Sequence, residues 1–430
     1  MSARDVETSP RRGFFGAAAE IGRDALGRPL ADYYLIMASA AAMVGIGLFM
    51  VLSASSVFAM FTTGSPYTYG KWQLMVAVIG VPVALVCSRL SQRTYELLSW
   101  VAVGGAIVLL ALTIVPHGFG VSSGGNQAWL KLGPLPAIQP SEFAKPALVI
   151  WSATLFATPW RARKLDRTRV LLMPYLPIAG LVLVLVLAEK DLGTAVIIAL
   201  IILLQLWFVG ARGKTLAALI GVAGVGAAIM VITSATRRAK VLAFLAGKLP
   251  FLHLTPPPVT SDQPDNALYA LATGGWWGVG PGASRQKWGG LYNGAHTDYI
   301  LAVLGEELGL FGVLVVLGLL FTLVYTGLRI AHRSKNTFWR VTAAGMTGWL
   351  MVQATINTLV AFGLMPVMGV PFPMLSYGGS ALLACFVAIG VLLAAARHEP
   401  EAEKALSGRK SPNKARPVTG VVVAQRRTSK

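Results

Sequence analysis

Charged residues are scarce in this chain, and their scarcity excludes most soluble proteins. Only 13% of its 430 residues are Asp, Glu, Lys or Arg, whereas 55% are hydrophobic and the mean hydropathy is +0.64. An average soluble domain carries about 25% charged residues. The apolar residues fall in long runs, so the composition excludes a soluble globular enzyme and indicates an integral membrane protein.

Cysteine and the common hydrolase motifs are also nearly absent. The two cysteines, Cys87 and Cys385, lie in or beside apolar runs, which argues against a disulfide framework and a cysteine-based metal site. No HExxH, Walker loop or Ser–His–Asp order occurs, so nucleophilic and zinc hydrolases have little support. The first 32 residues are polar and have no short apolar core, so we expect no cleavable signal peptide.

The apolar runs predict an all-α membrane protein. A membrane-spanning helix needs about 20 mostly apolar residues. The run 182–187 alternates Val and Leu and also fits a buried strand, but a lone strand leaves backbone groups unpaired in lipid, which favours a helix. The ten predicted spans are 33–54, 72–89, 97–116, 143–158, 170–188, 192–210, 215–234, 299–328, 341–363 and 378–396.

The Lys and Arg residues predict the orientation of these spans. The net charge is +19, and alternate loops carry most of the positive charge, which is typical of the cytoplasmic side. Both termini are then cytoplasmic: the segment 1–32 and the tail 397–430. The membrane domain is 33–396, and 235–298 is a large extracytoplasmic loop between the seventh and eighth spans. The six Lys or Arg residues of this outer loop require another explanation, such as an anionic ligand.

The C-terminal tail has a composition of its own. Residues 397–430 hold nine Lys or Arg against three Glu and few large apolar residues, which predicts a disordered basic extension. Its charge fits attraction to anionic membrane lipids, and it also fits docking to an acidic partner.

Two polar motifs lie between predicted outer helix ends. In the first, Ser141 is a candidate cap of the fourth helix, and Glu142 and Lys145 share one helical face. They form either a local ion pair or part of a site. In the second, Lys190 and Asp191 lie in a tight turn, where Asp191 either caps the sixth helix or belongs to the same site.

The third motif is a glycine-rich outer loop over 274–282, followed by Arg285 and Lys287 and then by His296-Thr297-Asp298-Tyr299. Backbone N–H groups of such a loop, together with its cations, can hold a phosphate. One His and one Asp are too few to predict a metal site. The adjacent Glu306 and Glu307 fall within the bilayer, so they should be neutral, paired or facing a cavity.

The fourth motif, 363–380, contains three prolines and several glycines and predicts a stiff, non-helical outer loop that includes Ser376 and Tyr377. The four motifs together describe a carboxylate-bearing, cation-lined site beside the bilayer. Such a site suits a substrate with a lipid anchor and a phosphate-type group. Because it faces away from ATP, the substrate must carry its own leaving group.

These motifs resemble those of the SEDS family of shape, elongation, division and sporulation proteins over about 33–396. The matching segments are QPSEFAK, KDLGT, GWWGVG, HTDYILAVLGEELG and GLMPVMGVPFPMLSYGGS. The resemblance implies a SEDS-type ten-helix fold in the bacterial cytoplasmic membrane. It also implies polymerisation of lipid II into peptidoglycan glycan strands, with a class B penicillin-binding transpeptidase as partner. The charged ends are most like the division member, which implies a place at the septum and contact with other division proteins.

The resemblance assigns roles to individual residues. Asp298 matches the catalytic aspartate, which would act as general base in an inverting glycosyl transfer. Ala128 stands where the family commonly has Arg, and Lys190 where it commonly has Pro; Lys190 is a candidate replacement for the missing charge. No cofactor is implied, a divalent cation on the pyrophosphate is left open, and no nucleic acid is expected. The predicted substrate-binding residues are Trp129, Glu142, Lys145, Lys190, Asp191, Arg285, Lys287, His296, Thr297, Ser376 and Tyr377.

Two rival functions are a lipid II flippase and a non-catalytic division scaffold. A flippase needs a polar path through the bilayer, whereas the inner halves of most predicted spans are apolar. A scaffold leaves the clustered outer charges unexplained. The sequence therefore favours a polymerase.

Overall fold

The structure is a computed structural model that describes most of the chain. The predicted cytoplasmic segment 1–32 is described only from residue 28, and the tail beyond residue 409 lies outside the described residues. The described residues are 28–115, 120–123, 126–131, 133, 137–158, 161, 168–248, 263–292 and 294–409.

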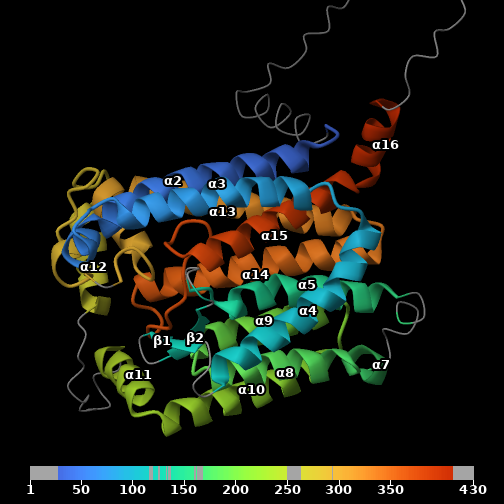
Figure 1. Cartoon of the computed structure of the whole chain (residues 1–430), viewed down its shortest axis with the longest axis horizontal. Coiled ribbons are helices and arrows are strands. Elements are labelled where there is room, and N and C mark those ends of the chain that lie inside the picture. The colour runs from blue at the N-terminus through green and yellow to red at the C-terminus, as the bar shows by residue number, and fades with distance from the viewer. Residues whose placement is uncertain are drawn as a thin grey trace, which may run out of the picture.

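Helices dominate the described residues, as the sequence predicts, and a helix coincides with each of the ten predicted spans. The long helices run side by side across Figure 1. They are α2 (Ala31–Thr63), α3 (Thr68–Cys87), α4 (Gln92–Ile114), α5 (Pro140–Ala157), α8 (Tyr175–Ala188), α9 (Leu192–Phe208), α10 (Gly213–Thr233), α13 (Ile300–Arg333), α14 (Thr337–Ala361) and α15 (Gly379–Arg397). The short helix α7 (Thr168–Leu172) precedes α8.

Six of the described helices are long and apolar enough to cross a membrane: α2, α3, α4, α10, α13 and α15. α8 and α9 are apolar but shorter, with 14 and 17 residues. The all-α membrane fold is therefore confirmed, and ten crossings remain a prediction. The segment 182–187 lies within α8, so the interpretation of this run as a helix is correct.

Several helices are longer than predicted, and α2 and α13 are the longest. α2 has 33 residues and α13 has 34, whereas the predicted spans are 33–54 and 299–328. A helix of 33 residues is about 50 Å long, and the hydrocarbon core of a bilayer is only about 30 Å thick. Hydropathy detects the apolar stretch, but helical hydrogen bonding continues past it in α2, so this helix extends beyond the core. α13 is broken at Gly309, where the backbone is not helical.

The predicted outer elements gather at one end of the bundle, on the left in Figure 1. The strands β1 (Gly120–Ser123) and β2 (Asn126–Leu130) form an antiparallel hairpin there. The predicted outer loop 235–298 contains the helices α11 (Ala235–Lys248) and α12 (Gln263–Gly274) and the short 3-10 helix η2 (Gln286–Trp288). The fourth motif is non-helical from 362 to 378, as predicted.

The structure of the C-terminal tail differs from the prediction as far as residue 409. α15 continues to Arg397, and α16 (Pro400–Arg409) follows it, so the prediction of a disordered segment starting at residue 397 is wrong as far as Arg409. Packing explains the difference: His398 stacks on Trp339 with ring centroids 4.5 Å apart, and Ala402 is buried. Composition alone does not reveal these contacts.

Candidate active site

A cavity of about 1090 Å³ lies among the ends of α2, α3 and α15 that are predicted to face outward, the strand β2 and the two irregular segments that flank α13 and α15. It brings together residues that are far apart in the sequence. Five of the predicted site residues line it: Trp129, His296, Thr297, Asp298 and Tyr377. The wall also contains Lys71 and Gln139, which the sequence interpretation did not assign to the site.

Asp298 is fixed from behind by α14. The side-chain amide of Asn357 donates to the backbone carbonyl of Asp298 at 2.8 Å and to that of Val370 at 2.7 Å. It thereby joins the HTDY segment to the fourth motif. The residue that precedes α13 is Tyr299, so Asp298 is not the cap of this helix. Asp298 therefore has no capping role, and it lines the cavity.

Burial makes the Asp298 carboxyl a weaker acid than usual. The protein excludes water from most of its surface, which raises its pKa to about 6. The positive charge of Lys240 opposes this rise, and the negative charge of Asp191 adds to it. At neutral pH the group is therefore mostly ionised and is a stronger base than an ordinary carboxylate, which suits proton abstraction.

His296 belongs to an aromatic group that forms one side of the cavity. Its ring centroid lies 5.2 Å from those of Phe58 and Tyr69 and 5.5 Å from that of Tyr377. Burial lowers the pKa of His296 to about 4, so its imidazole is neutral near pH 7. In this state His296 contributes shape and polarity rather than positive charge.

Ser376 lies behind the cavity and holds the fourth motif against the HTDY segment. Its hydroxyl donates to the carbonyl of Thr297 at 2.6 Å and accepts from the backbone N–H of Phe372 at 2.8 Å. The backbone N–H of Tyr377 donates to the carbonyl of His296 at 2.8 Å. Gln73 of α3 clamps the same loop by donating to the carbonyl of Ser376. These bonds position Thr297 and Tyr377 at the cavity wall.

Glu142 and Lys145 are buried inside the bundle. The Lys145 ammonium lies 2.8 Å from a carboxylate oxygen of Glu142 and 2.8 Å from the side-chain oxygen of Gln353 on α14. This arrangement matches the local-ion-pair alternative. The predicted cap role of Ser141 is wrong, because Gln139 precedes α5 and the buried Ser141 hydroxyl has no hydrogen-bond partner among the described residues.

Asp191 caps α9, which is the first of the two alternatives given for it. Its carboxylate accepts from the backbone N–H of Thr194 at 3.0 Å and from the side-chain amide of Gln139 at 3.2 Å. The preceding Lys190 is exposed and has a left-handed φ of 64°, a conformation that proline cannot adopt. Lys190 does not line the cavity, but its carbonyl accepts a hydrogen bond from Arg237 of α11 at 2.5 Å.

α11 brings a cation that the sequence interpretation missed. The Lys190–Arg237 bond ties this helix to the turn before α9, and Lys240 then acts electrostatically on Asp298. The only signal in the sequence was the excess of Lys and Arg in the outer loop. No spacing rule distinguishes Lys240 from its neighbours, because the tertiary structure determines which charge acts on Asp298.

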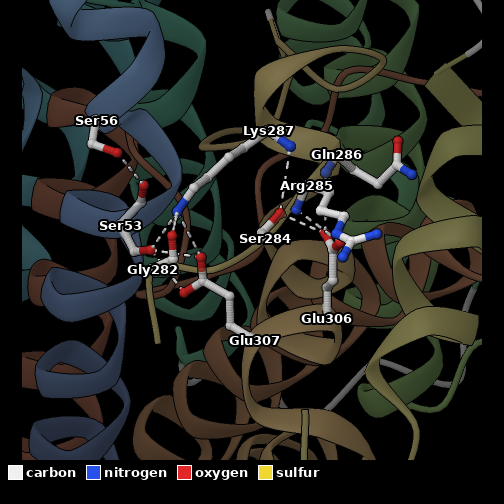
Figure 2. Close-up of polar contacts among 9 residues, drawn as sticks. All are labelled: Ser53, Ser56, Gly282, Ser284, Arg285, Gln286, Lys287, Glu306 and Glu307. Carbon is white, nitrogen blue, oxygen red and sulfur yellow. Dashed lines mark hydrogen bonds and ion pairs between the residues drawn. The ribbon is translucent and has the colours of Figure 1, made fainter. Parts of the chain in front are cut away.

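Arg285 and Lys287 are not among the residues that line the cavity. Figure 2 shows them beside Glu306 and Glu307 instead. Lys287 is buried and lies 2.9 Å from a carboxylate oxygen of Glu307. Glu306 accepts from the hydroxyl of Ser284 at 2.5 Å and from the backbone N–H of Arg285 at 2.9 Å. Glu307 is therefore paired and also lines a smaller pocket, whereas Glu306 is held by uncharged hydrogen-bond donors.

Among the described residues, no group of three or more His, Cys, Asp or Glu side chains is arranged to hold a metal ion. The carboxylates of Asp298 and Asp191 are near enough to interact electrostatically. Asp191, however, is already engaged as the cap of α9.

Comparison with known proteins agrees with this arrangement. The sequence model of the family described as cell cycle protein, FtsW/RodA/SpoVE, matches residues 33–401. The chain belongs to this family. A probable peptidoglycan glycosyltransferase FtsW of Mycobacterium tuberculosis is 38% identical over 383 residues, covering 89% of this chain and 71% of that protein. One of Trichlorobacter lovleyi is 35% identical over 374 residues, covering 85% and 93%.

Two solved structures have the same fold. A chain from a solved peptidoglycan synthase complex, described as coordinating polymerization and crosslinking, superposes with a TM-score of 0.62 at 26% identity, covering 85% of this chain and 97% of that one. The rod shape determining protein RodA of Thermus thermophilus gives a TM-score of 0.57 at 24% identity, covering 85% and 96%. The latter likeness concerns the fold alone.

Proposed function

We propose that this protein is a peptidoglycan glycosyltransferase that polymerises lipid II at the outer face of the bacterial cytoplasmic membrane. The observation that carries the proposal is the carboxylate of Asp298, which lines the cavity at the outer end of the bundle with a pKa raised to about 6. The FtsW relatives, which are named as probable peptidoglycan glycosyltransferases, support it.

In the proposed reaction, Asp298 removes the proton of the acceptor sugar's 4-hydroxyl. The acceptor oxygen forms a bond to the anomeric carbon of the donor sugar while the bond from that carbon to undecaprenyl pyrophosphate breaks, with inversion. The leaving pyrophosphate keeps the electron pair of the broken bond. Cations placed near it stabilise this developing charge.

The candidate cations differ in whether their charge is already paired. Lys145 and Lys287 are already paired with buried glutamates, so neither has a free charge to offer. Lys240 acts electrostatically on Asp298, and Lys71 lines the cavity. We therefore assign contact with the pyrophosphate to Lys240 and Lys71. A divalent cation beside them would supply further charge neutralisation.

A polymerase is favoured over a flippase by what lies below the cavity. The Lys145–Glu142 pair lies in the bundle interior, near the outer end of α5. Toward the opposite end of α5 and α14 the buried side chains are mostly apolar, including Leu148, Trp151 and Trp349. A polar headgroup would find few partners along this route.

We further propose cytoplasmic termini, a division role at the septum and a class B transpeptidase partner. The similarity to a chain of a solved peptidoglycan synthase complex supports a partner of this kind. Cysteines introduced singly at positions 64 and 410, with Cys87 and Cys385 removed, test the orientation. Only the first should react with an impermeant reagent added from outside; labelling at 410 would reverse the topology.

The decisive test is the Asp298→Asn variant. Asn keeps the size and hydrogen bonding of Asp but cannot accept the hydroxyl proton, so polymer formation should fall by about 10²-fold or more. The purified complex with its transpeptidase is supplied with lipid II, and glycan polymer is measured. Intact folding and transpeptidase binding are the controls. Activity within a few-fold of wild type would rule out the general base and leave Glu142 or Asp191 as candidates.

A further inference from the structure

Two polar clusters lie at different levels of the α2–α13 pair. At the outer level, Lys287 donates to Ser53 of α2 at 3.2 Å and pairs with Glu307 of α13 (Figure 2). At the other level, Asp32 of α2 pairs with Arg329 of α13. Between the two levels, neither 33–52 nor 308–328 contains an Asp, Glu, Lys, Arg or His residue.

The spacing of these clusters matches the thickness of a membrane. Asp32 and Ser53 are 21 positions apart, which is about 32 Å along a helix. The hydrocarbon core of a bilayer is about 30 Å thick. Because charged groups are costly within that core, the two clusters mark its two boundaries. The outer boundary then lies at the level of Ser53 and Glu307.

At this level α13 is interrupted, and the glycine-rich loop fills the break. Gly309 has a φ of 69°, and the backbone N–H groups of Leu310 and Phe311 donate to the carbonyls of Gly275 and Trp276. In return, the N–H groups of Val279 and Gly280 donate to the carbonyls of Glu306 and Glu307. Irregular backbone is tolerated at the membrane edge only when its polar groups are paired in this way.

The side chains of the same loop point away from the protein. Trp276 is 71% exposed and Trp277 is 81% exposed, and Trp288 at the end of η2 is 66% exposed. The ring of Trp277 lies 5.9 Å from that of Phe311, which is itself 60% exposed. Further along α13, Leu314 is also exposed within the apolar stretch. The tryptophans therefore continue the lipid-facing surface of α13.

We propose that the segment 275–288, here called the Trp loop, is an interfacial membrane anchor that sets the height of the catalytic cavity above the hydrocarbon core. Tryptophan favours the headgroup level of a bilayer because its ring is apolar and its N–H is polar. Glu306 and the Glu307–Lys287 pair hold the base of the loop at this level. The bilayer surface is thus the partner that this exposed aromatic patch fits.

The height that results suits a lipid-linked substrate, a point that rests on the proposed function. The cavity is bordered by Phe58 and Thr63 of α2. These lie five and ten positions beyond Ser53, about 8 to 15 Å above the boundary. The headgroup region occupies only about 5 to 8 Å on each side of the core. A phosphate anchored among the headgroups therefore places the attached sugars at the level of Asp298.

The test compares a Trp276→Ser/Trp277→Ser variant with a Trp207→Ser control. Trp207 is 60% exposed on α9, so it matches the loop tryptophans in exposure but lies outside the Trp loop. The proteins are reconstituted in liposomes whose lipids carry bromine at shallow or deep acyl positions. The difference in tryptophan fluorescence between wild type and the double variant reports on Trp276 and Trp277. This difference should be quenched more by shallow than by deep bromines. Equal quenching, or none, would overturn the anchor; this readout does not depend on activity.

The second readout is glycan polymer formed from lipid II with the transpeptidase complex. In liposomes the activity of the double variant should be about fivefold lower than that of wild type. The reason is that a shift of the protein relative to the bilayer costs modest free energy per ångström. In detergent it should remain within about twofold of wild type, because no bilayer has to be matched. A Trp276→Tyr/Trp277→Tyr variant should restore liposome activity, since tyrosine shares the interfacial preference.

An equal loss of activity in detergent and liposomes would show a structural role and overturn the anchor. Loss of copurification with the transpeptidase would instead identify the loop as a protein-binding surface and would also overturn it. If the wild type itself made no polymer, the proposed function would fail, and the quenching measurement alone would decide on the anchor.

Discussion

Lys145 and Glu142 form a buried ion pair, with 2.8 Å between the ammonium nitrogen and the carboxylate oxygen, and Gln353 accepts a second hydrogen bond from the same ammonium. The pair lies within α5, and the Lys145–Gln353 bond joins α5 to α14 below the cavity. The ammonium is held by both acceptors, so its first role is to hold these two helices together.

The Lys145–Glu142 pair predicts that single and double substitutions affect stability differently. Lys145→Met leaves the Glu142 carboxylate buried without its partner, which should lower the free energy of unfolding by about 3 to 5 kcal/mol. Replacing both residues, as Lys145→Met with Glu142→Leu, should recover most of this loss. Thermal unfolding in detergent measures both variants. A single variant as stable as wild type, but with raised KM for lipid II, would show that Lys145 binds substrate instead.

The raised pKa of Asp298 predicts the pH dependence of polymerisation. A general base works only when ionised, so the rate should be constant above about pH 7 and fall about tenfold per pH unit below the pKa of about 6. His296 cannot cause this loss of rate near pH 6, because its pKa of about 4 is lower than that of Asp298. The pH profile of kcat/KM measures it, and a midpoint near pH 4 would exclude Asp298 as the titrating base.

Removing the charge of Lys240 should shift that profile. The positive charge favours the ionised carboxylate, so Lys240→Met should raise the pKa of Asp298 and move the acid limb to higher pH. Lys248→Met, at the far end of α11, is the matched control and should leave the midpoint unchanged. An identical profile in both variants would mean that Lys240 is too well screened to act on the site.

Asn357 should be required for the position of Asp298. Asn357→Leu leaves the carbonyls of Asp298 and Val370 without a donor, and each lost bond should cost about 1 to 3 kcal/mol. Unfolding temperature and polymer formation should both fall. Thr355→Ala, which removes an exposed hydroxyl bonded only within α14, should change neither. Normal activity in Asn357→Leu would show that the HTDY segment is held by its other contacts.

The tail should divide into a required and a dispensable part. A chain ending at Arg409 keeps α16 and should fold and polymerise normally. A chain ending at Glu399 loses α16 and with it the buried Ala402, so its melting temperature should fall. Circular dichroism during heating in detergent compares the two. Equal stability would mean that α16 contributes nothing to the packing of α15.

Much of this protein follows from its sequence. Long apolar runs can satisfy their backbone only as helices in lipid, so the all-α fold and most helix positions are predictable from hydropathy. Asp191 as a helix cap and the irregular fourth motif follow from local chemistry, since capping and proline effects act within a few residues. The resemblance to the SEDS family likewise rests on local motifs.

The tertiary structure decided which of the charged residues meet. The sequence assigned Lys145 and Lys287 to the site and did not single out Lys240, yet the first two are paired with buried glutamates, and the charge of Lys240 acts on Asp298. The α16 helix and the docking of the Trp loop into the break of α13 were equally hidden. The physical reason is that burial and pairing depend on contacts between segments distant in the chain, and a sequence pattern reports only on neighbours along it.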